Sequence, residues 1–207
     1  YAVLFAYGAT ECGERELLGF QIHRSEGTAH WECMLNHLVK RKLDPEKLKL
    51  VIRDENSGCN EAVLNVLGEV PQQSCAVHLE RNLGKMVGKE NRALFQPAVS
   101  EIFKQPTLQK AREQLKDVLV RWQEIEPKAC LALRSPVDRS LVFYQVAEGE
   151  WRTHLKTTNI LERFFRELKR FEKSRQFRFA HEKSCKRFYY VYERDYNERF
   201  LRMPHLQ

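Results

Sequence analysis

Two carboxylates stand where metal-ion chemistry would need them. Asp54 ends the segment "KLKLVIRD", which predicts a short strand, and Glu162 lies in the first turn of a predicted helix that begins near Thr158 or Asn159. Open α/β sheets place their functional groups at the carboxyl ends of strands. Mg²⁺ prefers carboxylate oxygens, and two divalent ions about 3.5–4 Å apart can carry out phosphodiester chemistry. Taken alone, Asp54 is more simply explained as a turn or N-cap residue, and Glu162 as a carboxylate that favours a helix N-terminus.

A second candidate is the pair Cys75 and His78 in "CAVH". This C-x-x-H spacing is half of a zinc site, but no second half follows at a suitable distance, so structural zinc is not favoured. The six cysteines are scattered, with no C-x-x-C pair. That pattern is typical of reduced thiols in a cytosolic protein. The sequence contains no G-x-S-x-G element and no phosphate-binding glycine-rich loop, which leaves nucleophilic catalysis without support.

The segment around Glu162 is strongly basic. The net charge of the chain is +7, and from Trp151 onward Lys and Arg outnumber Asp and Glu by 15 to 7, whereas residues 1–150 hold 20 and 21. A basic region of this kind indicates binding to nucleic acid or another polyanion. A solvated basic helix is the alternative, and charge alone does not choose between them.

The first half of the chain predicts alternating strands and helices. Residues 1–9 and 15–23 predict an antiparallel hairpin with a turn at Gly13. A helix is expected over residues 28–41, then the strand that ends at Asp54, a helix, a short extended segment within 69–78, and a helix from about 76. This order predicts an α/β layered domain. The apolar N-terminus has no preceding basic segment and no cleavage site, so we interpret it as a strand and not a signal peptide.

The second half of the chain changes character. Residues 84–150 have helical periodicity with prolines between the segments, and the tail from about 179 predicts one more amphipathic helix. We therefore divide the chain into a first part at 1–83, a helical insertion at 84–150, and a second part at 151–207 with basic C-terminal helices. No apolar run approaches the roughly 20 residues that a membrane span needs.

The block "WRTHLKTTNILERFFRELKR" resembles the Glu-bearing block of the Mutator-type transposases, in their bacterial and archaeal insertion-sequence branch. Three other blocks resemble the family and follow its order: "GERELLGFQIHRSEGTAHWECML", "LKLVIRDENSG" and "QSCAVHLERNL". The resemblance covers nearly the whole chain. The matches in the first block are Trp151, Arg152, Leu155, Lys156, Thr157, Thr158, Asn159, Glu162, Arg163, Arg166, Glu167, Leu168, Lys169 and Arg170.

This resemblance implies a ribonuclease H-like fold, a mixed sheet flanked by helices and interrupted by an all-helical insertion. It implies cleavage of DNA at transposon ends and transfer of the 3′ hydroxyl into target DNA. Asp54 would be the second metal ligand and Glu162 the third, holding two Mg²⁺ or Mn²⁺ ions. Cys75 and His78 match the family's signature pair near the site; whether they contact DNA or support the fold stays open.

The resemblance also implies DNA contacts. Trp151 would stack on an unpaired base or, alternatively, anchor the insertion as a core residue. A homo-oligomer is expected by analogy with other transposases, in the cytoplasm and associated with the nucleoid of a prokaryote. The other residues expected to meet DNA are Lys156, Asn159, Arg163, Arg166, Lys169 and Arg170.

One carboxylate of the family's site has no counterpart here. The family carries its first catalytic Asp on the opening strand, just before the point where this chain begins. The remaining Asp residues, at 44, 117, 138 and 195, fall in a loop, the insertion and the tail. We therefore expect a fragment without its first strand, inactive as a polypeptide by itself. The alternative is a catalytically inactive relic or a domesticated DNA-binding protein that keeps the basic tail.

Overall fold

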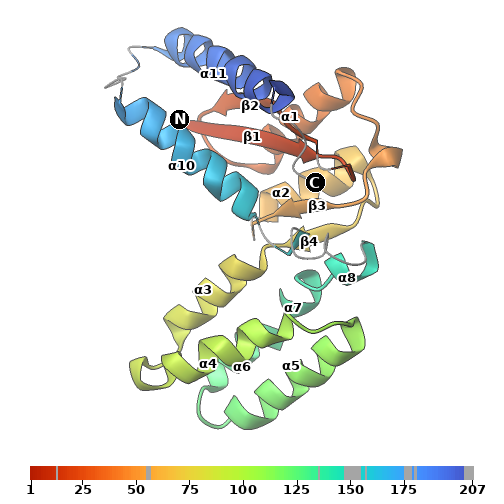
Figure 1. Cartoon of the computed structure of the whole chain (residues 1–207), viewed down its shortest axis with the longest axis vertical. Coiled ribbons are helices and arrows are strands. Elements are labelled where there is room, and N and C mark those ends of the chain that lie inside the picture. The colour runs from red at the N-terminus through yellow and green to blue at the C-terminus, as the bar shows by residue number, and fades with distance from the viewer. Residues whose placement is uncertain are drawn as a thin grey trace. The chain divides into compact units, whose positions relative to one another are not determined.

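The computed structural model describes residues 1–12, 14–54, 57–134, 136–146, 155–156, 158–174, 179 and 181–202. The chain forms two compact units (Figure 1). The first unit contains residues 1–46, 57–68 and 161–207, and the second contains 47–56 and 69–160. The turn predicted at Gly13 lies outside the described residues.

The first unit is built on the predicted hairpin, which is confirmed. Strands β1 (Ala2–Ala9) and β2 (Arg15–His23) pair antiparallel. The register shifts between Ala6 and Tyr7: Ala6 faces Gly19 and Tyr7 faces Leu17, so Leu18 is an extra residue in β2. Such a bulge increases the local twist of the pair.

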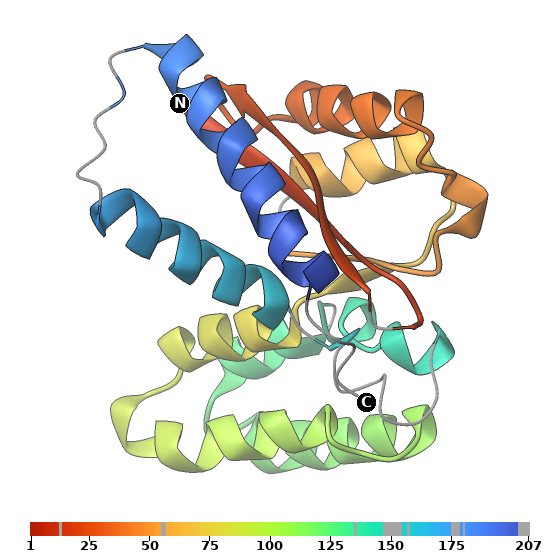
Figure 2. The same cartoon turned by 45° about the horizontal axis from the view of Figure 1, so that its top comes forward.

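An aromatic core covers this hairpin. It joins both strands to the helices α10 (Asn159–Ser174) and α11 (Glu182–Arg202), and Figure 2 shows α11 lying along the hairpin. The rings of Phe5 and Phe164 meet edge to face with centroids 5.1 Å apart, an arrangement that aromatic pairs prefer. The buried residues of this core are Phe5, Leu17, Ile22, Phe164, Leu168, Tyr189, Tyr192 and Tyr196.

Two further helices of the first unit pack on each other. Helix α1 (Thr28–Lys40) buries Met34, Leu35 and Leu38, as its helical spacing predicts. Helix α2 (Ser57–Leu67) packs against it. A hydrogen bond from Asn65 Nδ2 to Glu32 Oε1, 2.7 Å long, joins the two helices.

The second unit begins with two short parallel strands. After the 3-10 turn η1 (Pro45–Lys47), β3 (Val51–Arg53) pairs with β4 (Gln72–Ser74). The predicted alternation of strands and helices is thus confirmed, and the chain has a mixed α/β architecture. Within the described residues the four strands form two separate two-stranded sheets, so a single mixed sheet stays a prediction.

The rest of the second unit is helical. Between β4 and residue 146, every helix or strand that the structure describes is a helix: α3 (Ala76–Met86), α4 (Lys89–Ile102), α5 (Leu108–Trp122), α6 (Pro127–Arg134), α7 (Pro136–Arg139) and α8 (Phe143–Val146). This confirms the helical character predicted from 84 onward. The predicted boundaries at 84 and 150 stay a prediction, because the compact unit also includes β3, β4 and α3.

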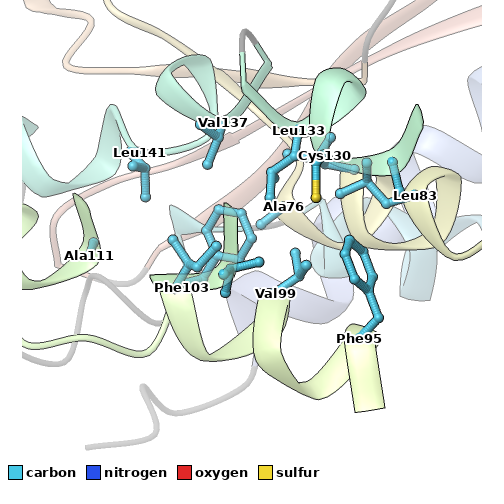
Figure 3. Packing of buried hydrophobic residues seen from close by; sticks show 14 of the residues in the cluster. Ala76, Leu83, Phe95, Val99, Phe103, Ala111, Cys130, Leu133, Val137 and Leu141 are labelled. Atoms are coloured by element: carbon cyan, nitrogen blue, oxygen red, sulfur yellow. The ribbon is translucent and has the colours of Figure 1, made fainter. Parts of the chain in front are cut away.

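A large apolar cluster holds these helices together. Figure 3 shows Phe95 and Val99 of α4 packed among Leu83 of α3 and Cys130 and Leu133 of α6. Because α3 both lines this core and begins directly after β4, packing of the core fixes the first turn of α3 against the strand ends. No helix in the described part of the chain is long and apolar enough to cross a lipid bilayer.

Candidate functional site

Asp54 and Cys75 lie next to each other because their strands are parallel and in register. Arg53 at the end of β3 pairs with Ser74 at the end of β4, and the next residue along each chain segment is Asp54 or Cys75. The Cys75 N–H donates to the Arg53 carbonyl oxygen at 3.0 Å. The predicted position of Asp54 after a strand is therefore confirmed, and a buried cysteine lies beside it.

His78 reaches Asp54 from the first turn of α3. Cys75 is the N-cap residue of this helix, so His78 stands at its third position, and side chains at these two positions face each other across the first turn. The His78 Nδ1 lies 2.9 Å from Asp54 Oδ1, with 24% of the His78 side chain and 59% of the Asp54 side chain exposed. The C-x-x-H spacing thus follows from helix-start geometry.

Thr158, which the sequence suggested as a helix cap and as part of the block that resembles the family, also belongs to this site. Its backbone N–H donates to Cys75 Sγ at 3.4 Å. Its Oγ1 lies 3.3 Å from the same sulfur and 3.5 Å from Asp54 Oδ1, so its single proton can go to either. The neighbouring Lys156 carbonyl accepts the Ala76 N–H at 3.0 Å. No signal in the sequence links positions 75 and 158, which are 83 residues apart.

The buried guanidinium of Arg53 joins the ends of β3 and β4 through hydrogen bonds. Arg53 Nε donates to Gln72 Oε1 at 3.1 Å, and its Nη1 lies 3.3 Å from Ser74 Oγ and 3.1 Å from the Asp54 carbonyl oxygen. A planar group with several donors in a fixed fork is suited to such bridging. Arg53 therefore fixes the backbone from which Asp54 projects.

The donor atoms of Asp54, Cys75 and His78 can hold a metal ion. One carboxylate oxygen, one thiol sulfur and one imidazole nitrogen all lie within 4.8 Å of one another. Zinc sites use these three donor types. Spacing in the sequence supplied two of these donors, and the pairing of β3 with β4 supplies the third.

The residues predicted to meet DNA lie mainly on α10. Glu162 is in the first turn of that helix, Phe164 and Leu168 are buried in the core of the first unit, and the basic residues are exposed: Arg163, Arg166, Lys169 and Arg170. Asn159 is the first residue of α10. The Lys156 ammonium lies 5.6 Å from the centre of the Phe143 ring, within cation–π range. Trp151 lies outside the described residues.

The first unit also has an open groove of about 530 Å³. Its lining comes from one stretch of β2, from α1 and from one face of α11: Phe20, Gln21, Ile22, His23, Cys33, Lys186, Arg187 and Tyr190. Burial and the nearby His30 lower the pKa of His23, while Lys186 forms an ion pair with Glu182 at 2.6 Å. The groove contains none of the predicted site residues.

Comparison with known proteins places these residues in a family context. Residues 1–203 match the family model described as "Transposase, Mutator family". The chain is 34% identical over 170 residues to the transposase for insertion sequence element IS406 of Burkholderia multivorans, covering 82% of this chain and 43% of the relative. It is 33% identical over 171 residues to the transposase for IS256 in transposon Tn4001 of Staphylococcus aureus, covering 81% and 43%.

A third relative aligns over more of the chain. The transposase for IS905 of Lactococcus lactis is 27% identical over 192 residues, covering 93% of this chain and 48% of the relative. The chain thus spans about half the length of the curated relatives it matches.

Proposed function

Because the chain belongs to the Mutator family of transposases, we propose that it forms the catalytic part of an insertion-sequence transposase. In this proposal the transposase to which this catalytic part belongs cuts DNA at transposon ends and joins the 3′ ends to target DNA, with divalent ions held by Asp54 and Glu162. The fold would be ribonuclease H-like, which the order of two antiparallel strands, helix, strand, helix, strand and helix supports.

The observation that carries this proposal is the contact between Asp54 and Thr158. The Thr158 hydroxyl lies 3.5 Å from the Asp54 carboxylate, and α10 begins at the next residue with Glu162 in its first turn. Residues four apart on a helix lie on the same face, about 5–6 Å from each other. Because α10 begins directly after a residue that contacts Asp54, its start supports the joint role of Asp54 and Glu162 that the resemblance implies.

Each group of residues has its own role in this proposal. Asp54 and Glu162 would hold the ions, which activate the attacking oxygen and stabilise the leaving oxygen of a phosphodiester. His78 would orient the Asp54 carboxylate through its contact at 2.9 Å. The exposed basic residues of α10, which all follow Glu162 in the helix, would hold DNA phosphates.

Manganese binding tests the two ligands. We expect Asp54→Asn and Glu162→Gln each to weaken Mn²⁺ binding at least tenfold, measured by the loss of the free-Mn²⁺ electron paramagnetic resonance signal in a titration. The control Glu124→Gln removes an exposed carboxylate in the second unit and should leave binding unchanged. Equal Mn²⁺ affinity in Glu162→Gln and Glu124→Gln would refute the proposed pairing and favour the catalytically inactive relic.

Salt dependence tests the DNA-binding face. Each phosphate contact contributes roughly 0.9 to the slope of log affinity against log salt concentration. The double substitution Arg166→Gln with Arg170→Gln should therefore lower that slope by about 2, measured by fluorescence anisotropy with a labelled duplex. The matched double substitution Arg112→Gln with Arg121→Gln, on exposed positions of α5, should leave the slope unchanged. Equal slopes in the two double variants would place the DNA elsewhere.

The 207-residue polypeptide by itself should bind DNA without cleaving it. The resemblance assigns only Asp54 and Glu162 as ligands, and we expect these two carboxylates without a third to be insufficient for cleavage. The measurement is nicking of a supercoiled plasmid in Mg²⁺ or Mn²⁺. Product formed by this polypeptide and abolished by Glu162→Gln would show that two carboxylates suffice, and would overturn this expectation.

A further inference from the structure

We infer that Cys75, His78 and Asp54 form a binding site for a zinc-type transition metal ion. The donor atoms of this site differ from those of the proposed magnesium site because one of them is a thiol. Mg²⁺ prefers oxygen ligands, whereas Zn²⁺ and similar transition metals bind sulfur. It shares Asp54 with the proposed function and does not depend on any activity toward DNA.

The geometry of the three donors carries this inference. Their atoms lie within 4.8 Å of one another, and ligands at Zn–N and Zn–S distances of about 2.0–2.3 Å around a tetrahedral ion lie about 3.3–3.7 Å apart. The His78 and Asp54 atoms, 2.9 Å apart, must therefore separate slightly, and any of the three distances as long as 4.8 Å must shorten by about 1 Å. Asp54 can make this adjustment because 59% of its side chain is exposed, while Cys75 and His78 are held on the first turn of α3.

Thr158 contacts the sulfur of the buried Cys75. Cys75 is 1% exposed, yet its sulfur faces the Thr158 N–H at 3.4 Å and the Thr158 hydroxyl at 3.3 Å. Both groups belong to Thr158, so this one residue holds the sulfur in a defined orientation beside Asp54.

Three protein donors leave one position of a tetrahedral ion open. Zinc sites of this kind keep the fourth position for water or a substrate oxygen. Thr158 fixes the orientation of Cys75, a role that outer partners of metal ligands commonly have. A bound ion would also compete for the Asp54 carboxylate, so Zn²⁺ should inhibit any reaction that needs Mg²⁺ on Asp54, and Cys75→Ser should relieve that inhibition.

Cobalt titration without DNA tests this site. The reduced, chelator-treated protein is titrated with Co²⁺, and the sulfur-to-cobalt charge-transfer band is followed in the near ultraviolet; competition with Zn²⁺ then gives the zinc affinity. We expect one ion per chain and a thiolate band that a large excess of Mg²⁺ does not remove. Absence of the band in the unsubstituted protein overturns the inference.

Matched substitutions locate the site. Cys75→Ser should abolish the band, whereas Cys130→Ser, at a cysteine 2% exposed in the same unit, should leave it intact. A band that survives Cys75→Ser, or zinc affinities that are equal in the two variants, overturns the inference. Circular dichroism checks that each variant folds.

If Cys75→Ser does not fold, His78→Gln and Thr158→Val test the metal site instead, with His37→Gln and Glu162→Gln as controls. His78→Gln changes a partly exposed ligand and should lower the zinc affinity at least tenfold, whereas His37→Gln on the exposed face of α1 should not. Thr158→Val keeps the side-chain shape and should lower the zinc affinity about tenfold by removing the hydroxyl near the sulfur. Glu162→Gln should leave it unchanged, so loss of the zinc site and loss of the proposed Mn²⁺ site are distinguishable.

Discussion

Replacing Gln73 by Leu should destabilise the second unit, because this buried side chain fastens β4 to the end of the helical region. Gln73 is 0% exposed. Its Nε2 donates to the carbonyl oxygens of Ser140 at 2.7 Å and Ser74 at 2.8 Å, and its Oε1 accepts the Phe143 N–H at 3.0 Å. Leu fills similar space and makes none of these bonds.

The expected magnitude follows from the groups that lose their partner. The Ser140 carbonyl and the Phe143 N–H remain buried, and each buried backbone group left without a partner costs about 1–3 kcal/mol. The apolar side chain of Leu offsets part of this loss by its own burial. We therefore expect the free energy of unfolding to fall by about 3 kcal/mol, which corresponds to a drop in melting temperature of about 10 °C.

Differential scanning calorimetry measures this change. The matched control is Gln145→Leu on α8, where the side chain is exposed, and there we expect a change within about 0.5 kcal/mol. If Gln73→Leu and Gln145→Leu melt at the same temperature, the two hydrogen bonds to Ser140 and Phe143 do not hold the helical region to β4, and the reasoning fails.

Two predictions concern the first unit. The Asn197 side chain accepts the Leu17 N–H at 2.8 Å and donates to the Leu17 carbonyl at 3.0 Å, so Asn197→Ala should lower the free energy of unfolding by about 2 kcal/mol in urea titration; an unchanged urea midpoint would contradict it. Burial raises the pKa of Tyr192 to about 12, above the value near 10 of an unfolded chain. The folded state holds this proton more tightly, so the associated stability is present below pH of about 10 and is lost as the pH rises toward 12. The urea midpoint of Tyr192→Phe should therefore fall less over this range than that of Tyr190→Phe, whose tyrosine is exposed; equal falls would contradict the assignment.

Local elements of the fold were predictable from the sequence because their causes are local. The alternation of residues 15–23 predicts β2, and the apolar spacing at Met34, Leu35 and Leu38 predicts the buried face of α1. The bulge at Leu18 was not predictable, since it depends on how β2 pairs with β1. The hydrogen bonds of the buried Gln73 were not predictable either, because its partners at positions 140 and 143 lie far along the chain.

The candidate site was predictable only in pieces for the same reason. Asp54, Cys75 and His78 each carry a recognisable local signal, a strand end or a C-x-x-H spacing. Thr158 carries the signal of a helix start and a match to the family block, but neither predicts its contact with Cys75, which depends on segments that are distant in sequence. Contacts between residues this far apart in the sequence depend on how the whole unit packs, and no single stretch of sequence determines that packing.

The register of β3 and β4 decides whether the site exists. Side chains alternate between the faces of a sheet, so a shift of one residue would turn a side chain to the opposite face and move it about 3.3 Å along the strand. Asp54 would then no longer lie beside Cys75, although every residue and every spacing in the sequence would be unchanged. A pair of three-residue strands has few hydrogen bonds of its own to resist such a shift. The side-chain bonds from Arg53 to Gln72 and Ser74 join the two strands at their ends, and they are therefore the physical reason that a carboxylate, a thiol and an imidazole meet at one point.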